Sequence, residues 1–257
     1  MLSASNLTVG YGTETVARDL SFALDAGEIL AIIGHNGSGK STLVKTILGV
    51  ERALGGSLTW AAGARPRTIG YLGQLTDFDR RFPMRVCDLV ATGGWSQRGF
   101  FDAAGRGARA RAASAIDRVG LRDIATMPLH KLSTGQLQRA LFARTMVQDS
   151  QVIILDEPFA SVDQTTQAEL TEHVLAWAAQ GRAIILVLHN LSTALAKCRR
   201  TLLLGKGTGR FGASAEILNA EGLVEMGYLA ADQAQWLSDL AASKDGRTAS
   251  GMEAEHA

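Results

Sequence analysis

A glycine-rich segment between residues 34 and 41 carries the clearest chemistry in the chain. It reads Gly34-His-Asn-Gly-Ser-Gly-Lys40-Ser41 and fits the pattern G-x-x-x-x-G-K-[ST]. Glycines let successive backbone N–H groups turn toward an anion, and a helix that begins here adds the positive end of its dipole. The lysine amine would pair with the β- and γ-phosphates of ATP, and the serine hydroxyl would ligate Mg²⁺. An ordinary glycine-rich turn is the alternative.

An acidic pair follows a buried apolar run later in the chain. Val152–Leu155 is apolar throughout and leads into Asp156 and Glu157. In open α/β sheets ligands bind at the carboxyl ends of the strands, so both carboxylates are expected to face the phosphates. Asp156 would hold Mg²⁺ through its water shell, and Glu157 would activate the attacking water. Acidic residues also end strands for structural reasons, so the pair is informative only beside the glycine-rich segment.

The segment Leu132-Ser133-Thr134-Gly135-Gln136 is a third motif. Ser133 followed by Gln136 is a capping box, which predicts the start of a helix. Its small hydroxyl and its glycine leave backbone N–H groups available for a second phosphate contact. Helix starts on different lobes of one chain cannot easily meet at one phosphate, so we expect a head-to-tail pair of chains. An ordinary capped helix is the alternative.

Hydrophobic patterning predicts the elements that position these motifs. Short alternating strands fill residues 2–33 and end with Ile29–Ile33, directly before the glycine-rich segment. A second strand pair is predicted at Ser57–Trp60 and Thr68–Leu72, and residues from about 84 to 148 are predicted to be mostly helical.

The later strands Val152–Leu155 and Ala183–Leu188 are apolar along their whole length. Such strands, alternating with helices, imply a parallel sheet that is covered on both faces. The fold class is therefore predicted to be α/β.

Composition limits the other classes of function. The chain has 257 residues, 46% of them hydrophobic, and a formal net charge of +1, which favours a globular protein and no nucleic-acid groove. Cys87 and Cys198 lie far apart in no metal-ligand spacing and are expected to be small buried thiols. No signal-peptide pattern is found, and no apolar run approaches the roughly 18 residues that cross a bilayer. We expect any membrane role to come through a partner.

Taken together, the motifs resemble those of ABC transporter nucleotide-binding subunits. The resemblance covers about residues 1–225, and the motifs occur in the order of that family. It implies a P-loop NTPase core over residues 1–240, with an antiparallel β subdomain and a helical subdomain at about 76–148, and a polar tail at 241–257 that is expected to fray.

The resemblance also assigns roles to further residues. Tyr11 would stack on adenine, Gln74 would sense Mg²⁺ and the γ-phosphate, and His189 would be the switch histidine that acts with the catalytic Glu157. Ser161 and Asp163 would belong to a loop at the dimer interface. The ATP-binding residues would be Tyr11, Gly34, His35, Asn36, Gly37, Ser38, Gly39, Lys40, Ser41, Thr42 and Gln74. The Mg²⁺ ligands would be Ser41, Gln74 and Asp156, and the signature that contacts the partner's ATP would be Leu132, Ser133, Thr134, Gly135 and Gln136.

The chain departs from the family pattern at a few positions. Thr134 stands where the family usually has Gly, which narrows the approach to the partner's nucleotide. Gly73 replaces a frequent Pro, and Asn190 replaces a frequent Asp. None of these changes removes a group that hydrolysis requires.

The stretch from Gln74 through Phe82-Pro83 to Gly99-Phe-Phe101 resembles the zinc and manganese importer ATPases. This resemblance implies a homodimeric motor on the cytoplasmic face of the membrane, bound to a permease subunit and, through it, to a solute-binding protein. An apolar groove near Phe82-Pro83 could receive an amphipathic helix of that permease. Internal packing of the helical subdomain is the other explanation for the groove.

Other readings stay open at this stage. The cargo could be a metal chelate, a drug or a lipid. A non-transport ABC ATPase of the chromosome-maintenance or translation-factor type is disfavoured, because it would need a long heptad insertion or a second cassette, and the sequence contains neither.

Overall fold

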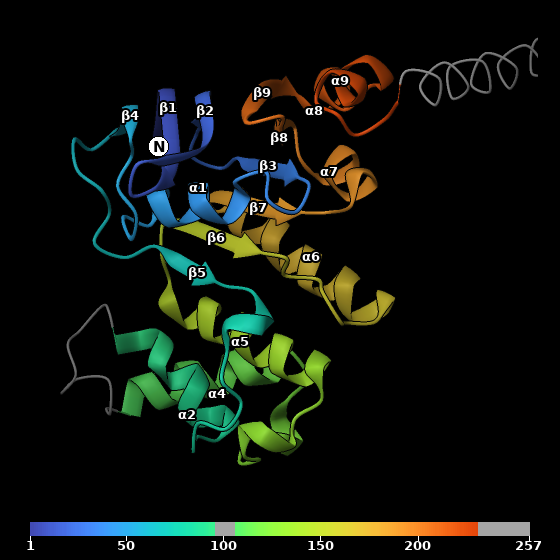
Figure 1. Cartoon of the computed structure of the whole chain (residues 1–257). Helices are drawn as coiled ribbons and strands as arrows, with labels where there is room; N and C mark the ends of the chain where they lie inside the picture. The colour runs from blue at the N-terminus through green and yellow to red at the C-terminus, as the bar shows by residue number, and fades with distance from the viewer. Residues whose placement is uncertain (96–105, 231–257) are drawn as a thin grey trace, which may run out of the picture.

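The computed structural model describes residues 1–95 and 106–230 (Figure 1). The predicted tail at 241–257, the end of the predicted domain beyond residue 230, and Gly99-Phe-Phe101 of the importer resemblance lie outside the described residues.

A six-stranded sheet forms the centre of the fold and runs in the order β5-β6-β7-β3-β8-β9. Neighbouring strands from β5 to β8 are parallel, whereas β9 pairs with β8 in the antiparallel sense. The strands are β3 (Ile29–Gly34), β5 (Gly70–Leu72), β6 (Val152–Asp156), β7 (Ala183–Leu188), β8 (Arg200–Gly205) and β9 (Thr208–Ala213). The predicted α/β class with a covered parallel sheet is confirmed. Sequence patterning missed β8 and β9.

Both faces of this sheet are buried. Successive residues of a strand point to opposite sides of the sheet, so alternate residues of β3 enter different hydrophobic cores. Ile29, Ala31 and Ile33 of β3 belong to a core shared with the helices, whereas Leu30 and Ile32 belong to a second core. The second core includes the antiparallel strands and helix α1 (Lys40–Ile47). This two-sided burial explains why β3, β6 and β7 have apolar sequences without alternation.

The second sheet is antiparallel and has the order β2-β1-β4. Its strands are β1 (Leu2–Tyr11), β2 (Glu14–Leu24) and β4 (Gly55–Trp60). The predicted pairing of Ser57–Trp60 with Thr68–Leu72 is wrong, because β4 pairs with β1 whereas β5 pairs with β6. The burial of each strand explains the difference. Residues of β4 are exposed or half-buried, as in an edge strand, whereas Gly70 and Leu72 of β5 are buried in the parallel sheet.

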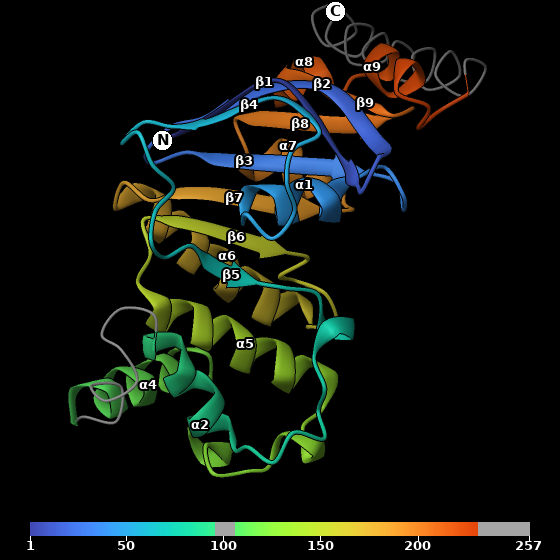
Figure 2. The same cartoon turned by 60° about the vertical axis from the view of Figure 1, so that its left-hand side comes forward.

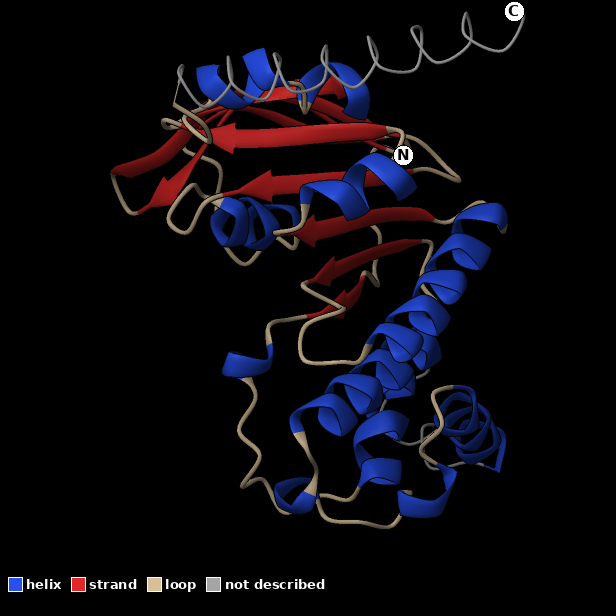
Figure 3. Cartoon of the chain, turned by 90° about the vertical axis from the view of Figure 1, so that its right-hand side faces the viewer, coloured by secondary structure: helices blue, strands red, loops and turns tan. Residues whose placement is uncertain are grey.

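The helices form two groups, one against the sheets and one below them in Figure 2, and Figure 3 shows the helices and strands from a third side. One group flanks the sheets and contains α1, α6 (Gln164–Ala179), α7 (Leu191–Lys197), α8 (Ser214–Ile217) and α9 (Ala220–Glu225). The other lies beyond the β5 edge and contains α2 (Val86–Ala91), α4 (Arg106–Arg118) and α5 (Thr134–Gln148). Short 3₁₀ helices lie at Leu75–Asp77, Thr92–Gly94, Arg122–Ile124 and Leu129–Lys131. Across the described ranges, no helix combines the length and the apolar character needed to cross a bilayer.

Candidate functional site

The carboxyl ends of adjacent parallel strands bring distant motifs to one edge of the sheet. β3 leads into the glycine-rich segment, which we call the P-loop (residues 34–41), β6 leads into Glu157, and β7 leads into His189. The register aligns these ends, since Ile33 lies opposite Leu188 and Asp156 lies opposite Val187. β5, which pairs with β6, delivers Gln74 to the same edge.

The P-loop has the backbone that an anion cradle requires. Gly37 and Gly39 have φ values of 82° and 99°, in the left-handed region that glycine adopts without strain. A Cβ atom on Gly34 would lie 2.0 Å from Ser38 Oγ, so a larger residue there would force the Ser38 side chain to move. The Ser38 hydroxyl is buried and has no hydrogen-bond partner in the part of the chain that the structure describes. A buried orphan hydroxyl at this position is suited to a phosphate oxygen.

Lys40 folds back over the P-loop. Its side chain is buried, and Nζ donates hydrogen bonds to the carbonyl oxygens of Gly34 at 2.7 Å and His35 at 3.0 Å. Burial lowers the pKa of the Lys40 amine, and the negative charges of Glu157 and Asp156 oppose that effect. The amine is thus hydrogen-bonded to the loop and lies within electrostatic reach of both carboxylates.

Glu157 is the centre of a hydrogen-bonded cluster. Its Oε1 accepts a hydrogen bond from Gln74 Nε2 at 3.3 Å and lies 2.6 Å from His189 Nε2. Its backbone has φ 51°, an unusual conformation for a residue with a side chain, and its N–H donates to Val187 O at 3.1 Å. Glu157 therefore lies in a strained turn, which is held by its hydrogen bond to Val187 of β7, and its carboxylate lines the cavity.

This cluster and the P-loop share one cavity with a volume of 620 Å³. It is lined by Tyr11, Val16, Asn36, Gly37, Gly39, Lys40, Ser41, Thr42, Gln74, Glu157 and His189. Tyr11 is 42% exposed, and its hydroxyl accepts a hydrogen bond from Thr42 Oγ1 at 3.1 Å. Most of the predicted ATP-binding residues thus meet in one place.

His35 lies apart from that cavity. Its ring stacks on Tyr228 with 3.8 Å between the ring centroids, and its Nε2 lies 3.2 Å from Gly227 O. The side chain of this predicted ATP-binding residue therefore contacts the segment after α9. Only its backbone remains within the P-loop.

The predicted capping box at the start of α5 is confirmed. Gln136 N donates to Ser133 Oγ at 3.1 Å, and Ser133 N donates to Gln136 Oε1 at 2.9 Å. Leu132 is buried, and Thr134 Oγ1 accepts a hydrogen bond from Arg80 Nη2 at 3.1 Å. Among the described residues, none of positions 132–136 lines the cavity that holds the P-loop.

Ser161 and Asp163 follow the acidic pair and precede α6. Ser161 has φ 62° and belongs to a smaller cavity of 430 Å³ that also includes Thr134 and Glu157. Asp163 caps α6, since its carboxylate accepts from Thr166 N at 2.9 Å and Thr166 Oγ1 at 2.8 Å. These hydrogen bonds lower the pKa of Asp163. Asp163 therefore has a structural role as the cap of α6, besides its predicted place in a loop at the dimer interface.

Sequence reasoning missed Gln138, Arg80 and Tyr228 as neighbours of the site. Gln138 is buried against the backbone of Glu157 and Pro158. In the sequence, Gln138 is a polar residue next to an apolar one, Leu137, within a predicted helix. Such a residue usually lies on the exposed face of the helix, so the sequence did not indicate that Gln138 is buried. The contacts of Arg80 and Tyr228 depend on folding across segments that are far apart in the chain, so local patterning could not reveal them.

The parallel sheet and its P-loop define the fold class as a P-loop NTPase, and the comparisons identify the family. A profile of the ABC transporter family matches residues 17–160. A manganese transport system ATP-binding protein of Bacillus subtilis is 34% identical and covers 85% of this chain and 88% of its own length. A probable metal transport system ATP-binding protein of Chlamydia muridarum is 32% identical and covers 87% of each chain. The chain belongs to the ABC transporter family and is an ATP-binding ATPase of that family.

Solved structures agree with this assignment. An inward-facing ABC transporter described as metal-chelate type has 29% identity, a TM-score of 0.74 and 89% coverage of both chains. A dimeric ATP-binding cassette bound to ADP and Pi has 21% identity, a TM-score of 0.73, and covers 83% of this chain and 99% of its own. The latter supports the fold alone. The resemblance to ABC nucleotide-binding subunits is thus confirmed, as is the similarity to metal-transport ATPases.

Proposed function

We propose that ATP is hydrolysed at the cavity between the P-loop and Glu157, and that Glu157 is the general base. The observation that carries this proposal is the cluster in which Gln74 and His189 both contact Glu157 Oε1. Glu157 takes a proton from the attacking water, while His189 and Gln74 hold the carboxylate in place. Lys40 exchanges its contacts with loop carbonyls for the β- and γ-phosphates. Tyr11 stacks on the adenine.

The residues of this edge fit Mg²⁺. The Ser41 hydroxyl, the Asp156 carboxylate and the Gln74 side-chain carbonyl are oxygen donors, which this ion prefers. Gln74 uses its amide nitrogen to contact Glu157, which leaves its carbonyl oxygen for the metal. Bound Mg²⁺ would neutralise charge on the phosphate oxygens.

A second copy of the chain completes each site in this proposal. The start of α5, with Ser133 and Thr134, lies outside the P-loop cavity of its own chain. The backbone N–H groups of its first turn and its helix dipole suit the phosphates of a nucleotide held by another chain. Closure brings the helical subdomain, about residues 76–148, toward the partner's P-loop, and the loop at Ser161 and Asp163 lines the interface.

The proposed cargo is a metal ion, most directly manganese or zinc. Relatives that are 34% identical are named manganese and zinc transport system ATP-binding proteins. In this proposal the dimer sits on the cytoplasmic side of a membrane and drives a permease, which receives its metal from a solute-binding protein. A metal chelate is the second candidate, because a chelated iron transport system protein of Yersinia pestis is 33% identical.

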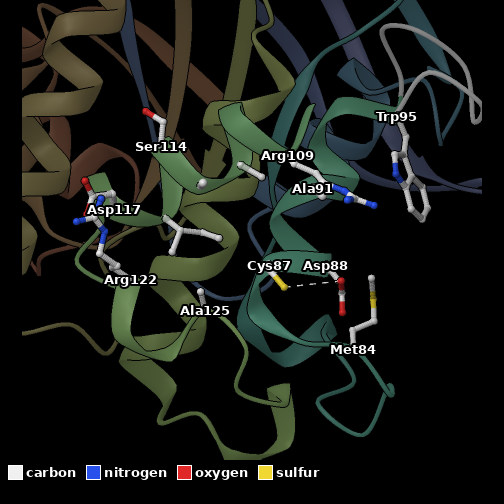
Figure 4. A pocket seen from close by; sticks show the side chains of 13 residues that line it. Met84, Cys87, Asp88, Ala91, Trp95, Arg109, Ser114, Asp117, Arg122 and Ala125 are labelled. Atoms are coloured by element: carbon white, nitrogen blue, oxygen red, sulfur yellow. Dashed lines mark hydrogen bonds and ion pairs between the residues drawn. The ribbon is translucent and has the colours of Figure 1, made fainter. Parts of the chain in front are cut away.

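The docking surface proposed for the permease is the apolar groove between α2 and α4, shown in Figure 4. It has a volume of 770 Å³, and Met84, Cys87 and Ala91 line one side of it. The sequence predicted a groove near Phe82-Pro83, but neither residue lines this one. Phe82 is 58% exposed and lies two residues before Met84, which does line the groove. An amphipathic helix would cover this exposed apolar surface.

A complementation experiment tests cargo and docking together. Deleting the gene is expected to lower cellular manganese or zinc in metal-poor medium, and the wild-type gene is expected to restore it. Phe82→Asp should fail to restore it while the purified subunit keeps its ATPase activity, because an unpaired carboxylate buried at an interface is costly. Leu195→Asp is the matched control, since Leu195 is an exposed apolar residue of α7, 47% accessible.

Different results of this experiment would contradict the proposed cargo and the proposed docking surface. Unchanged manganese and zinc in the deletion strain, with failed uptake of another solute, would show that the cargo is wrong. Equal restoration by Phe82→Asp and Leu195→Asp would show that the permease does not dock at the exposed apolar surface around Phe82.

A further inference from the structure

Helix α5 carries a buried amide that reaches the backbone next to the proposed base. Gln138 is only 1% exposed, and its Nε2 donates hydrogen bonds to Glu157 O at 3.1 Å and to Pro158 O at 2.9 Å. A buried donor shared by successive carbonyls holds that stretch of backbone at a set distance from the helix. Gln138 does not line the P-loop cavity, and its contacts with Glu157 O and Pro158 O give it a direct structural route to the proposed base.

Glu157 needs such support because its backbone conformation is unfavourable. A residue with a Cβ atom at φ 51° persists only where neighbouring contacts hold it. Its N–H is held by Val187 O, and its carbonyl accepts from both Gln138 Nε2 and Ala160 N. Backbone rotation at this position would swing the carboxylate away from Gln74 and His189.

A second contact shows that the whole turn rests on α5. Ser161, at the far end of this turn, also has a positive φ of 62°. A Cβ atom on Gly135 would lie 2.8 Å from Ser161 O, so the first turn of α5 packs directly on that backbone. Thus α5 contacts the turn at Glu157 through Gln138 and at Ser161 through Gly135.

We infer that Gln138 is a positioning residue for ATP hydrolysis, which sets the place of the Glu157 carboxylate by holding its backbone from helix α5. The inference rests on the proposed role of Glu157 as the base. Because α5 begins at the capping box of Ser133, the same helix connects the surface offered to the partner's nucleotide with the base of the chain's own site. Movement of α5 as the dimer closes therefore moves Glu157.

The first test replaces the amide with an apolar side chain of similar length. Gln138→Met is expected to lower kcat by about tenfold or more with KM for ATP within about twofold, because a misplaced base affects the chemical step. Gln148→Met is the matched control. Gln148 lies at the other end of α5, and its Oε1 accepts from Tyr71 N at 2.9 Å. The control variant should keep kcat, and a thermal melt of each variant checks folding.

A double-mutant cycle separates positioning from a general loss of structure. In protein that already carries Glu157→Gln, adding Gln138→Met should change the residual rate by less than about twofold, since no base is left to misplace. If the losses instead multiply in full, or if KM rises while kcat stays constant, Gln138 is a structural residue and the inference is wrong. An unchanged kcat in Gln138→Met also overturns it.

A second variant keeps the test decisive if Gln138→Met does not fold. Gln138→Glu keeps the size of the side chain, and only its protonated form can donate a hydrogen bond. Its kcat relative to wild type should therefore be highest at low pH, where the carboxyl is protonated, and a ratio that stays equally low at every pH contradicts the inference. The Glu157→Gln single variant tests the proposed base independently. Wild-type turnover in that variant refutes the role of Glu157, whereas loss there with full activity in Gln138→Met refutes only the role of Gln138.

Discussion

The contacts that the side chains around Glu157 make with one another are what indicate a role for them in the site. Glu157 contacts Gln74 and His189 through one carboxylate oxygen, while Lys40 lies under the electrostatic influence of both acidic residues. Each contact joins segments far apart in the chain. A lone Gln in a loop or a lone His after a strand would otherwise be ordinary surface residues.

Lys40 provides the prediction at this scale. Lys40→Ala should weaken ATP binding by about tenfold or more, because a charge-assisted hydrogen bond to phosphate is lost. Lys197→Ala, at an exposed lysine of α7, is the control and should bind ATP normally. Equilibrium titration with a fluorescent ATP analogue measures both variants. Equal affinities in the two variants would contradict the phosphate role of Lys40.

Much of the site was predictable from residue types because its chemistry is local. The P-loop pattern requires glycines, a lysine and a serine at set spacing, and Gly39, Lys40 and Ser41 do line one cavity with Glu157. The stacking of His35 on Tyr228 was not predictable, because the partner lies beyond the last motif. Cys198 is buried as expected, and burial raises the pKa of its thiol to about 12, but Cys87 is only half-buried.

At the scale of elements, helix α5 joins the parts of the site. Its capping box was readable from sequence because Ser133 and Gln136 interact across a single turn. Its contacts with the turn at Glu157–Ser161 were not readable, since they join α5 to residues after β6. The pairing of β4 with β5 was predicted wrongly for a similar reason. Which strands pair depends on contacts between distant segments in the folded chain, and local patterning does not show those contacts.

Gly135 tests the contact between α5 and that turn. Gly135→Ala should lower kcat, because the added Cβ atom would lie 2.8 Å from Ser161 O and must displace the backbone of the turn. Binding of ATP to the P-loop should persist. Gly107→Ala in α4 is the control, since among the described residues its Cβ atom would meet only Arg111 Nη1, at an ordinary contact distance of 3.6 Å.

The control should keep kcat and gain up to about 1 kcal/mol of stability, because alanine favours helix over glycine. Steady-state ATPase rates and thermal unfolding midpoints distinguish the two variants. A wild-type kcat in Gly135→Ala would mean that the close approach of α5 to Ser161 has no part in hydrolysis.

At the scale of the whole molecule, the P-loop is separated from the start of α5, where we propose a second phosphate-binding surface. The P-loop lies at the end of β3, whereas Ser133 lies at the start of α5, in the helical group beyond the β5 edge (Figure 2). In the proposed dimer, α5 of a second chain faces the P-loop of the first. Removal of Mg²⁺ or ATP should return such a pair to single chains.

A mixed pair of variants tests this shared site most directly. All chains carry Glu157→Gln, so that bound ATP is held rather than hydrolysed. One chain also carries Ser133→Arg and the other Lys40→Ala, so only the mixture can assemble one site with an intact P-loop and an intact capping box. Rapid gel filtration with radioactive ATP and Mg²⁺ counts the nucleotide retained in the dimer fraction. We predict about one ATP per mixed dimer and almost none with either variant alone; a mixture that retains no more ATP than its parents would contradict a site shared between chains.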